Sequence, residues 1–366
     1  MGSESGWLYA GCNNPADPRR HVVNGLVTAS RSSAAMGMVR PRHRRSQHRA
    51  SQPLTTSSDP CRATTEHTTN RGSNRSHEHA DYVGDVTSPR ITVVGSVNLD
   101  LVARCHALPR PGETITASAF SLVPGGKGAN QALAAQRMGG MVRMVARVGR
   151  DSYGTLALAD LRAGGVELSG VHDGDVPTGI AMIVVDDTGE NEIVVVPGAN
   201  STLTAHDVRV QPGDAVLVQL EVGDDALIAA AEQCAAMFVL NAAPSRPVPA
   251  AVLRRADVVI VNRLEAEALG STRPGALVAI TYGAQGAALF RDGVELARAN
   301  PPPVHAVDGT AAGDAFCGAF VVALLQDQPD DVALRRACAA GALAASRPGA
   351  QPSLPTAAEV DAILGR

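Results

Sequence analysis

Residues 215–261 read AVLVQLEVGDDALIAAAEQCAAMFVLNAAPSRPVPAAVLRRADVVIV. Three short apolar runs, at 215–220, 237–240 and 258–261, have the composition of buried strands. Ala-rich helical stretches lie between them, at 226–234 and 250–255. Alternation of strand and helix predicts an α/β fold with a mostly parallel sheet that helices cover on both faces.

The same rhythm extends to both sides of this stretch. Ile91-Thr-Val-Val-Gly95 is a β-branched run followed by a turn signal, and residues 277–281 form another candidate strand.

Residues 113–120 and 180–196 instead alternate apolar and polar residues without a helix between them. The second segment holds a turn, Asp186-Asp-Thr-Gly-Glu190, and therefore predicts a hairpin. This hairpin could extend the main sheet or form a small β lid over an active site; the pattern alone does not separate the two.

Residues 1–88 differ from the rest in composition. They are rich in Ser, Thr, Arg, His, Asn and Pro and lack sustained periodicity, so we expect them to be disordered. They carry 11 Arg against 7 acidic residues, and six of the ten histidines, including His77 and His79. A histidine metal site or a basic arm that contacts nucleic acid are the functional alternatives. The favoured interpretation is a tail or an over-extended gene start, for which Met36 and Met38 are alternative internal start residues.

Charge and cysteine usage limit the function classes. The net charge is −4, and residues 89–366, with 21 basic and 29 acidic residues, are acidic, which argues against a nucleic-acid-binding fold. The six cysteines form no C-x-x-C pair or zinc-like spacing, as expected in a reducing compartment. Neither a membrane-spanning apolar run nor a secretory signal is evident, so we expect a cytoplasmic location and no membrane partner.

The motif DGTAAGD, from Asp308 to Asp314, precedes a stretch with the composition of a buried helix. Small residues at a helix N-terminus let backbone amides approach a phosphate closely. A carboxylate beside such an anion hole can take a proton from a hydroxyl during phosphoryl transfer. Asp314 could equally be a simple helix cap.

A second glycine-rich loop, VPGGKGAN at 123–130, also precedes a helical stretch. It is not a Walker A loop, because Gly128 follows Lys127 where Ser or Thr is required. Lys127 is the only lysine of the chain, which favours a need for a compact point charge, although chance is the alternative.

Three weaker motifs follow predicted strands. Asn98 and Asp100 come after the first strand, where polar residues of an α/β fold face the ligand crevice. The turn TYGAQG at 281–286 offers backbone donors to nucleotide phosphates, or is a plain hairpin turn. Asn262 and Glu265 could arrange magnesium-bound water, or cap a helix.

Together and in this order, the motifs resemble the ribokinase family within the phosphofructokinase-B-type carbohydrate kinases. The resemblance covers residues 89–366 and rests mainly on GGKGAN and AAGD. It implies a three-layer α/β/α sandwich with a mostly parallel central sheet and a β-sheet lid, built from about 101–123 and 179–197. It also implies a transferase that uses ATP with Mg²⁺ or another divalent cation, K⁺ as an activating monovalent cation, and a homodimer through the lid.

The resemblance also assigns roles to residues of this sequence. Asp314 would be the general base, and the backbone of Ala311, Ala312 and Gly313 the anion hole. The sugar would be bound by Asn98, Asp100, Gly126, Lys127, Gly128, Asn130, Glu221 and Asp314. ATP would contact Asn262, Thr281, Tyr282, Gly283, Ala284, Gln285, Gly286, Gly313, Asp314 and Cys338, with Glu265 supporting magnesium. The loops that hold the monovalent cation would contain Asp308, Thr310, Ala344, Arg347, Gly349 and Ser353.

Two positions depart from the family pattern: Gly309, where Thr is usual, and Cys338, often His or Asn. The expected reaction is phosphorylation of D-ribose by ATP at its primary 5-hydroxyl. Deoxyribose, fructose and nucleosides are the alternative substrates, although a chain with 3% aromatic residues is poor in stacking surfaces for a nucleoside. A sugar-binding regulator without turnover and a nucleic-acid-binding N-terminal arm are the alternatives from other classes.

Overall fold

The computed structural model describes residues 88–365. The predictions of disorder, of a histidine metal site and of a nucleic-acid-binding arm concern residues that, apart from Ser88, lie outside this range.

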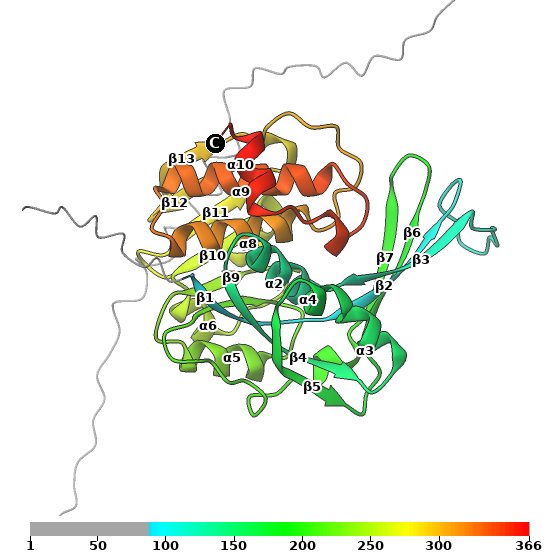
Figure 1. The fold of residues 1–366 in the computed structure, drawn as a ribbon, viewed down its shortest axis with the longest axis horizontal. Helices are drawn as coiled ribbons and strands as arrows, with labels where there is room; N and C mark the ends of the chain where they lie inside the picture. Colours follow the sequence, from blue (N-terminus) through cyan, green and yellow to red (C-terminus); the bar gives the residue numbers. More distant parts are fainter. Residues whose placement is uncertain (1–87, 366) are drawn as a thin grey trace, which may run out of the picture. The chain divides into compact units, whose positions relative to one another are not determined.

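A nine-stranded sheet forms the centre of the fold (Figure 1), with the strand order β13-β12-β11-β10-β9-β8-β1-β4-β5. All neighbours from β5 to β11 pair in parallel, whereas β12 and β13 are antiparallel additions at one edge. The strands are β1 (Arg90–Val94), β4 (Met141–Gly149), β5 (Glu167–Gly174), β8 (Ala215–Gln219), β9 (Phe238–Asn241), β10 (Val258–Asn262), β11 (Leu277–Thr281), β12 (Ala287–Arg291) and β13 (Val294–Ala299).

Helices cover both faces of this sheet, as predicted. Because successive side chains of a strand point to opposite faces, Val93 and Val94 belong to different hydrophobic cores. The first core packs against α2 (Lys127–Arg137), α4 (Ala159–Ala163), α8 (Ala312–Leu325), α9 (Asp330–Ala345) and α10 (Ala357–Ile363). The second packs against α5 (Asp224–Gln233), α6 (Ala250–Arg255) and α7 (Arg263–Leu269). The three-layer α/β/α architecture is therefore confirmed.

A separate four-stranded sheet, with the order β3-β2-β6-β7, stands beside the sandwich (Figure 1). It consists of β2 (Asn98–Arg104), β3 (Ala119–Gly125), β6 (Gly179–Val185) and β7 (Asn191–Val196). The predicted hairpin is confirmed by the antiparallel pairing of β6 with β7. The alternative that it extends the main sheet is wrong, because β6 pairs with β2 instead of with a strand of the large sheet. We call this four-stranded sheet the lid.

The predicted strands and the helices predicted at 226–234 and 250–255 match the observed elements to within two residues at each end, except for the segment 113–120. Two helices begin earlier than predicted, because α2 starts at Lys127 inside GGKGAN and α8 starts at Ala312 inside DGTAAGD. Of the alternating segment 113–120, only the last two residues are in a strand, because β3 begins at Ala119. The remaining elements, α3 (Ser152–Ala157), η2 (Gly198–Thr202), η3 (Gly283–Gln285) and η4 (Gln351–Ser353), are short. None of the helices between residues 88 and 365 combines the length and apolar character that crossing a membrane requires.

Candidate active site

A cleft of about 890 Å³ opens between the lid and the carboxyl ends of the parallel strands. The terminal residues of three neighbouring strands, Asn241, Asn262 and Thr281, line it, as expected for ligand sites of open α/β sheets. The cleft brings together thirteen of the predicted site residues: Asn98, Asp100, Gly126, Lys127, Asn130, Glu221, Asn262, Glu265, Thr281, Thr310, Ala311, Gly313 and Asp314.

The glycines of the GGKGAN loop are explained by close backbone approach. A Cβ on Gly128 would lie 2.5 Å from the Ser96 amide nitrogen, and Gly126 adopts φ +89° where helix α2 begins. The Ala129 amide donates to the Ser96 carbonyl at 2.9 Å, which locks the loop to the turn between β1 and β2. Gly128 itself does not line the cleft; it supports the loop from behind.

Asp314 lies buried in the first turn of α8, at the floor of the cleft. Its two carboxylate oxygens accept hydrogen bonds from α2: Oδ2 from Asn130 Nδ2 at 2.9 Å, and Oδ1 from Gln131 Nε2 at 2.8 Å. The side chain caps no backbone amide of its own helix, because the N-cap position belongs to Ala311. The helix-cap interpretation of Asp314 therefore has no support in its contacts.

Ala311 gives α8 an unusual start. It adopts the left-handed conformation at φ +60°, which costs free energy for a residue with a Cβ and is concentrated at functional sites. The amides of Gly313 and Asp314 follow in the first turn of this 14-residue helix, where amides lack acceptors within the helix. A Cβ on Gly313 would meet no atom within 4 Å, so an anion could approach these amides closely.

Two further carboxylates, Asp100 and Glu221, line the same cleft. Glu221 Oε2 accepts from the Ser96 hydroxyl at 2.5 Å and from the Lys127 amide at 3.1 Å, so it is tied to both loops. Burial, and then the nearby charges of Glu221 and Asp314, raise the pKa of Asp100 to about 7. This group therefore changes its charge near neutral pH.

Lys127 supplies the positive charge of the cleft. Burial alone would lower its pKa, but the carboxylates of Asp314, Glu221 and Glu265 outweigh that effect and raise it. The lysine is therefore charged at neutral pH, among carboxylates that converge on one space.

Asn262 and Glu265 cap a helix, which was one of the two interpretations of this pair, beside the arrangement of magnesium-bound water. The Glu265 amide donates to Asn262 Oδ1 at 2.8 Å, and the Asn262 amide donates to Glu265 Oε2 at 2.8 Å, which is a complete capping box for α7. Both residues also line the cleft, so the cap positions them without excluding a ligand. Burial raises the pKa of Glu265.

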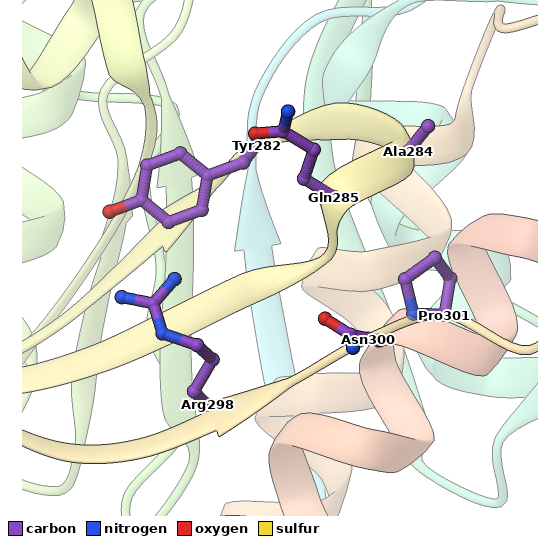
Figure 2. A pocket seen from close by; sticks show the side chains of 6 residues that line it. All are labelled: Tyr282, Ala284, Gln285, Arg298, Asn300 and Pro301. Carbon is purple, nitrogen blue, oxygen red and sulfur yellow. The ribbon is translucent and has the colours of Figure 1, made fainter. Parts of the chain in front are cut away.

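A second pocket has a volume of about 460 Å³. It is lined by Tyr282, which directly follows Thr281 of the cleft in sequence. Tyr282, Ala284, Gln285, Arg298, Asn300 and Pro301 line it, and Figure 2 shows the Tyr282 ring near the guanidinium of Arg298, whereas the Gln285 amide points away from Asn300. The guanidinium of Arg298 lies 5.6 Å from the centre of the Tyr282 ring. The turn joins antiparallel strands β11 and β12, so it is a hairpin turn, and it presents two polar side chains to the pocket.

Cys338 lines neither pocket. It is buried, and its thiol donates to the Ala299 carbonyl at 3.6 Å. Burial raises the pKa of this thiol to about 12, so it stays neutral.

The predicted cation loops lie side by side. Asp308 accepts from the Thr310 amide and from the Gly349 amide, each at 2.9 Å, and the amides of Val307 and Asp308 donate to the Ala345 carbonyl. Burial alone would raise the pKa of Asp308, but the bonds from Thr310 and Gly349 lower it. Gly309 does not adopt positive φ, and a Cβ there would meet nothing within 4 Å, so its backbone does not require glycine.

Sequence reasoning missed several polar residues of the site. Asn200 donates to Asn98 Oδ1 at 2.7 Å and accepts from the Val97 amide at 2.9 Å, and Ser96, Gln131 and Asn241 contact the residues described above. Asn241 directly follows the predicted strand 237–240, which was a usable signal. Ser96 directly follows the predicted run 91–95 and offered the same signal. Asn200 and Gln131 lack a distinctive local pattern, because their role comes from contacts across the fold.

Comparison with known proteins identifies the family. A model of the pfkB family of carbohydrate kinases matches residues 88–357. The chain belongs to this family. It is therefore an ATP-dependent carbohydrate kinase, as the glycine-rich loops and the carboxylate at the start of α8 indicated.

Relatives and solved structures agree with this assignment. Ribokinase of Bacillus subtilis is 38% identical over 293 residues, with 75% of this chain and 99% of that protein covered. The crystal structure of ribokinase from Thermotoga maritima matches with a TM-score of 0.70 and 32% identity, over 76% of this chain and all of that one. Arabidopsis thaliana ribokinase, complexed with ribose and ATP, matches with a TM-score of 0.67 and 30% identity, again over 76% and 100% of the two chains.

Proposed function

We propose that this kinase transfers the γ-phosphoryl group of ATP to the primary 5-hydroxyl of D-ribose, with Asp314 as the general base. The observation that carries the proposal is the placement of Asp314: a buried carboxylate, held by two amide donors, in the first turn of α8 beside the amide of Gly313. The relatives named ribokinase, and the Arabidopsis complex with ribose and ATP, support ribose as the substrate.

The chemistry follows from this placement. Asp314 accepts the proton of the ribose 5-hydroxyl while the oxygen of that hydroxyl forms a bond to the γ-phosphorus. The bond from this phosphorus to the β,γ-bridging oxygen breaks at the same time and releases ADP. The amides of Gly313 and Asp314 stabilise the negative charge of the transferring group, and Ala311 sets the start of the helix. The amide of Ala312, expected to belong to the anion hole, instead donates to the Gly309 carbonyl at 3.2 Å. Lys127 adds a positive charge to the same space.

The remaining cleft residues match a ligand rich in hydroxyl groups. Asp100 and Glu221 offer acceptors, Asn98 and Asn130 offer amides, and Gly126 and Gly128 shape the loop. Asn130 Oδ1 is buried without a hydrogen-bond partner in the part of the chain described, while its Nδ2 binds Asp314. A sugar hydroxyl next to the base would satisfy this orphaned acceptor, which is costly to leave unpaired.

ATP would occupy the region from Asn262 to the 281–286 turn, with its phosphates toward α8. Within residues 88–365 there is no cluster of three or more His, Cys, Asp or Glu side chains arranged to hold a metal. Magnesium would therefore be bound mainly through the ATP phosphates, with Glu265 as a charged oxygen donor near its water shell. The magnesium ion would neutralise part of the negative charge of the phosphates.

The loops around Asp308 fit a monovalent cation. The proposed ligands are the Asp308 carboxylate, the backbone carbonyls of Thr310, Ala344, Arg347 and Gly349, and the oxygen of Ser353, whose hydroxyl donates to the Ala350 carbonyl at 2.7 Å. Gln351, between Gly349 and Ser353, is fully buried, and neither atom of its amide has a partner within residues 88–365. A bound ion with its water would satisfy such an amide. Potassium would hold the start of α8 in its binding geometry.

We further propose a homodimer through the outer face of the lid. Phe120, Leu122, Met182 and Val194 are exposed large apolar residues on this small sheet, and Met182 pairs with Val194 across β6 and β7. Exposed apolar patches of this kind mark association sites. Sedimentation of the wild type against Met182→Lys tests it: a dimer that becomes a monomer is expected, and a wild-type monomer would exclude it. A cytoplasmic location also remains a proposal.

A coupled ADP-release assay over ribose, deoxyribose, fructose and a nucleoside, with potassium or choline as the monovalent cation, tests the function. We expect the highest kcat/KM for ribose and higher activity in potassium. Preference for another sugar would replace the substrate but keep the kinase. Absence of turnover with every substrate, together with ribose binding, would favour the sugar-binding regulator.

A further inference from the structure

Gln131 is the second residue that holds the Asp314 carboxylate. It follows Asn130 on α2 and is fully buried, so it cannot itself contact the sugar from the solvent side of the cleft. Its Nε2 lies 2.8 Å from Asp314 Oδ1 and 2.9 Å from Asn241 Oδ1, and therefore donates to both. Its Oε1 accepts from Gln219 Nε2 at 2.7 Å.

The direction of these hydrogen bonds is fixed at one end by the backbone. Asn241 Nδ2 donates to the Ile260 carbonyl at 3.0 Å, and a carbonyl can only accept. Asn241 must therefore turn its Oδ1 toward Gln131, which in turn must present its NH₂ group. The amide of Gln131 is thus aimed with its donors at Asp314 before any substrate binds.

The residues that aim Gln131 belong to the rigid sheet. Gln219 and Asn241 end the neighbouring strands β8 and β9 and pair in register, so their side chains point to the same face. That face packs against α2 and α8 through Leu217, Val239 and the helix side chains. Gln131 therefore connects the carboxylate on α8 to two strands of the sheet.

We propose that Gln131 is a positioning residue for phosphoryl transfer, which fixes the rotation of the Asp314 carboxylate toward the acceptor hydroxyl. This inference rests on the proposed role of Asp314 as the base. With Gln131 in place, both carboxylate oxygens are held; without it, only the bond from Asn130 remains, and the carboxylate can rotate about its χ2 torsion. Misplacement of a reacting group by about 1 Å can cost a factor of about 100 in rate.

Gln131→Met tests the proposal, because methionine keeps the length and unbranched shape of the side chain without its donors. We expect kcat to fall about 10- to 100-fold while KM for ribose and for ATP stays within about threefold. Gln131→Leu also removes both the donor and the acceptor of the side-chain amide, and it should lose as much. Gln136→Met is the matched control: it removes an amide of the same helix whose Oε1 accepts from the Val142 amide at 3.0 Å, outside the hydrogen bonds that aim Gln131, and it should keep kcat within about threefold.

Two results would overturn the proposal: a Gln131→Met enzyme with kcat within about threefold of wild type, or equal losses in Gln131→Met and Gln136→Met. If neither Gln131 variant can be purified in a folded form, Asn241→Ser tests the proposal instead, because it removes the amide oxygen that orients Gln131. A lowered kcat with unchanged KM supports the proposal, and an unchanged kcat overturns it. Asp314→Asn in parallel separates the two claims: if it retains turnover, the assignment of the base fails, whatever Gln131 does.

Discussion

The two ends of the cleft are built in different ways. At the end that we propose for the sugar, buried or half-buried side chains bind one another: Asp314 with Asn130 and Gln131, and Glu221 with Ser96. At the end that we propose for the nucleotide, a short turn is held by its own backbone, with the Tyr282 amide donating to the Gly286 carbonyl at 2.8 Å, and its side chains line a second pocket (Figure 2).

This difference shows where the fold has fixed its geometry in advance. A network of buried polar groups is costly to disturb, because each lost partner leaves another group unsatisfied. A turn held by backbone bonds tolerates side-chain changes. Substitutions at the sugar end should therefore lower kcat or ribose affinity strongly, whereas those at the nucleotide end should have small effects on ATP alone.

The largest effect is expected for Asp314→Asn. It keeps the size of the side chain but removes the base, so kcat should fall about 1,000-fold, while ribose binding stays measurable by calorimetry. Steady-state ADP release measures kcat. Turnover within tenfold of wild type would contradict the role of Asp314 and remove the main reason for treating the sugar end as preorganised.

The next effect concerns the loop that supports this end. Gly128→Ala would place a Cβ 2.5 Å from the Ser96 amide nitrogen, so the loop must shift, and we expect a loss of about 2 kcal/mol in the free energy of unfolding. Gly309→Ala is the matched control, since a Cβ there meets nothing within 4 Å. Urea unfolding of both variants compares them. Equal stability would show that the glycine loop is less constrained than its contacts indicate.

The pH dependence of ribose binding tests the charge at the sugar end. Because the pKa of Asp100 is raised from 3.8 to about 7, the folded protein holds this proton more tightly than the unfolded chain. Its contribution to stability is complete below about pH 4 and is lost as the pH rises through 7.

The ionised carboxylate is the better acceptor for sugar hydroxyls, so ribose affinity should rise over the same range. Calorimetry from pH 6 to 8 should show a falling Kd for the wild type. Asp100→Asn should give a Kd about tenfold higher that varies little with pH. A pH-independent Kd in the wild type would mean that Asp100 does not titrate in this range.

The smallest effect is expected at the nucleotide end. Arg298→Ala removes the guanidinium that faces Tyr282 in the second pocket, and KM for ATP should rise by no more than about threefold, with KM for ribose unchanged. Initial rates at varied ATP measure this. A loss of kcat comparable to that of Asp314→Asn would abolish the contrast between the two ends.

The elements that sequence predicted well are those with local causes. Apolar runs and Ala-rich stretches predicted the sandwich, because burial on both faces of a parallel sheet demands such runs. Asn98, Asp100 and Asn262 were predicted to face the ligand crevice because each follows a predicted strand, and all three line the cleft. GGKGAN was recognised, although its Gly128 packs closely against Ser96 and does not line the cleft.

The contacts that sequence could not supply are long-range ones. Gln131 meets Asp314, which is 183 positions away, and Gln351 is buried with an amide that has no partner among residues 88–365, and no local pattern marks it. Cys338 was expected near ATP, yet it lines neither pocket and donates to the Ala299 carbonyl, because its place on α9 is set by helix packing. Such contacts depend on how the helices pack against the sheet, and no regular spacing of residues in a single sequence predicts them.

The central claim, that this cleft phosphorylates the 5-hydroxyl of ribose through Asp314, is tested most directly by identifying the product. Incubation of ribose, ATP, magnesium and potassium with wild-type enzyme, followed by ¹³C and ³¹P NMR, should show phosphate coupled to C5 of ribose, and Asp314→Asn should give no product in the same time. Phosphate on another carbon, or equal product from the variant, would contradict the account.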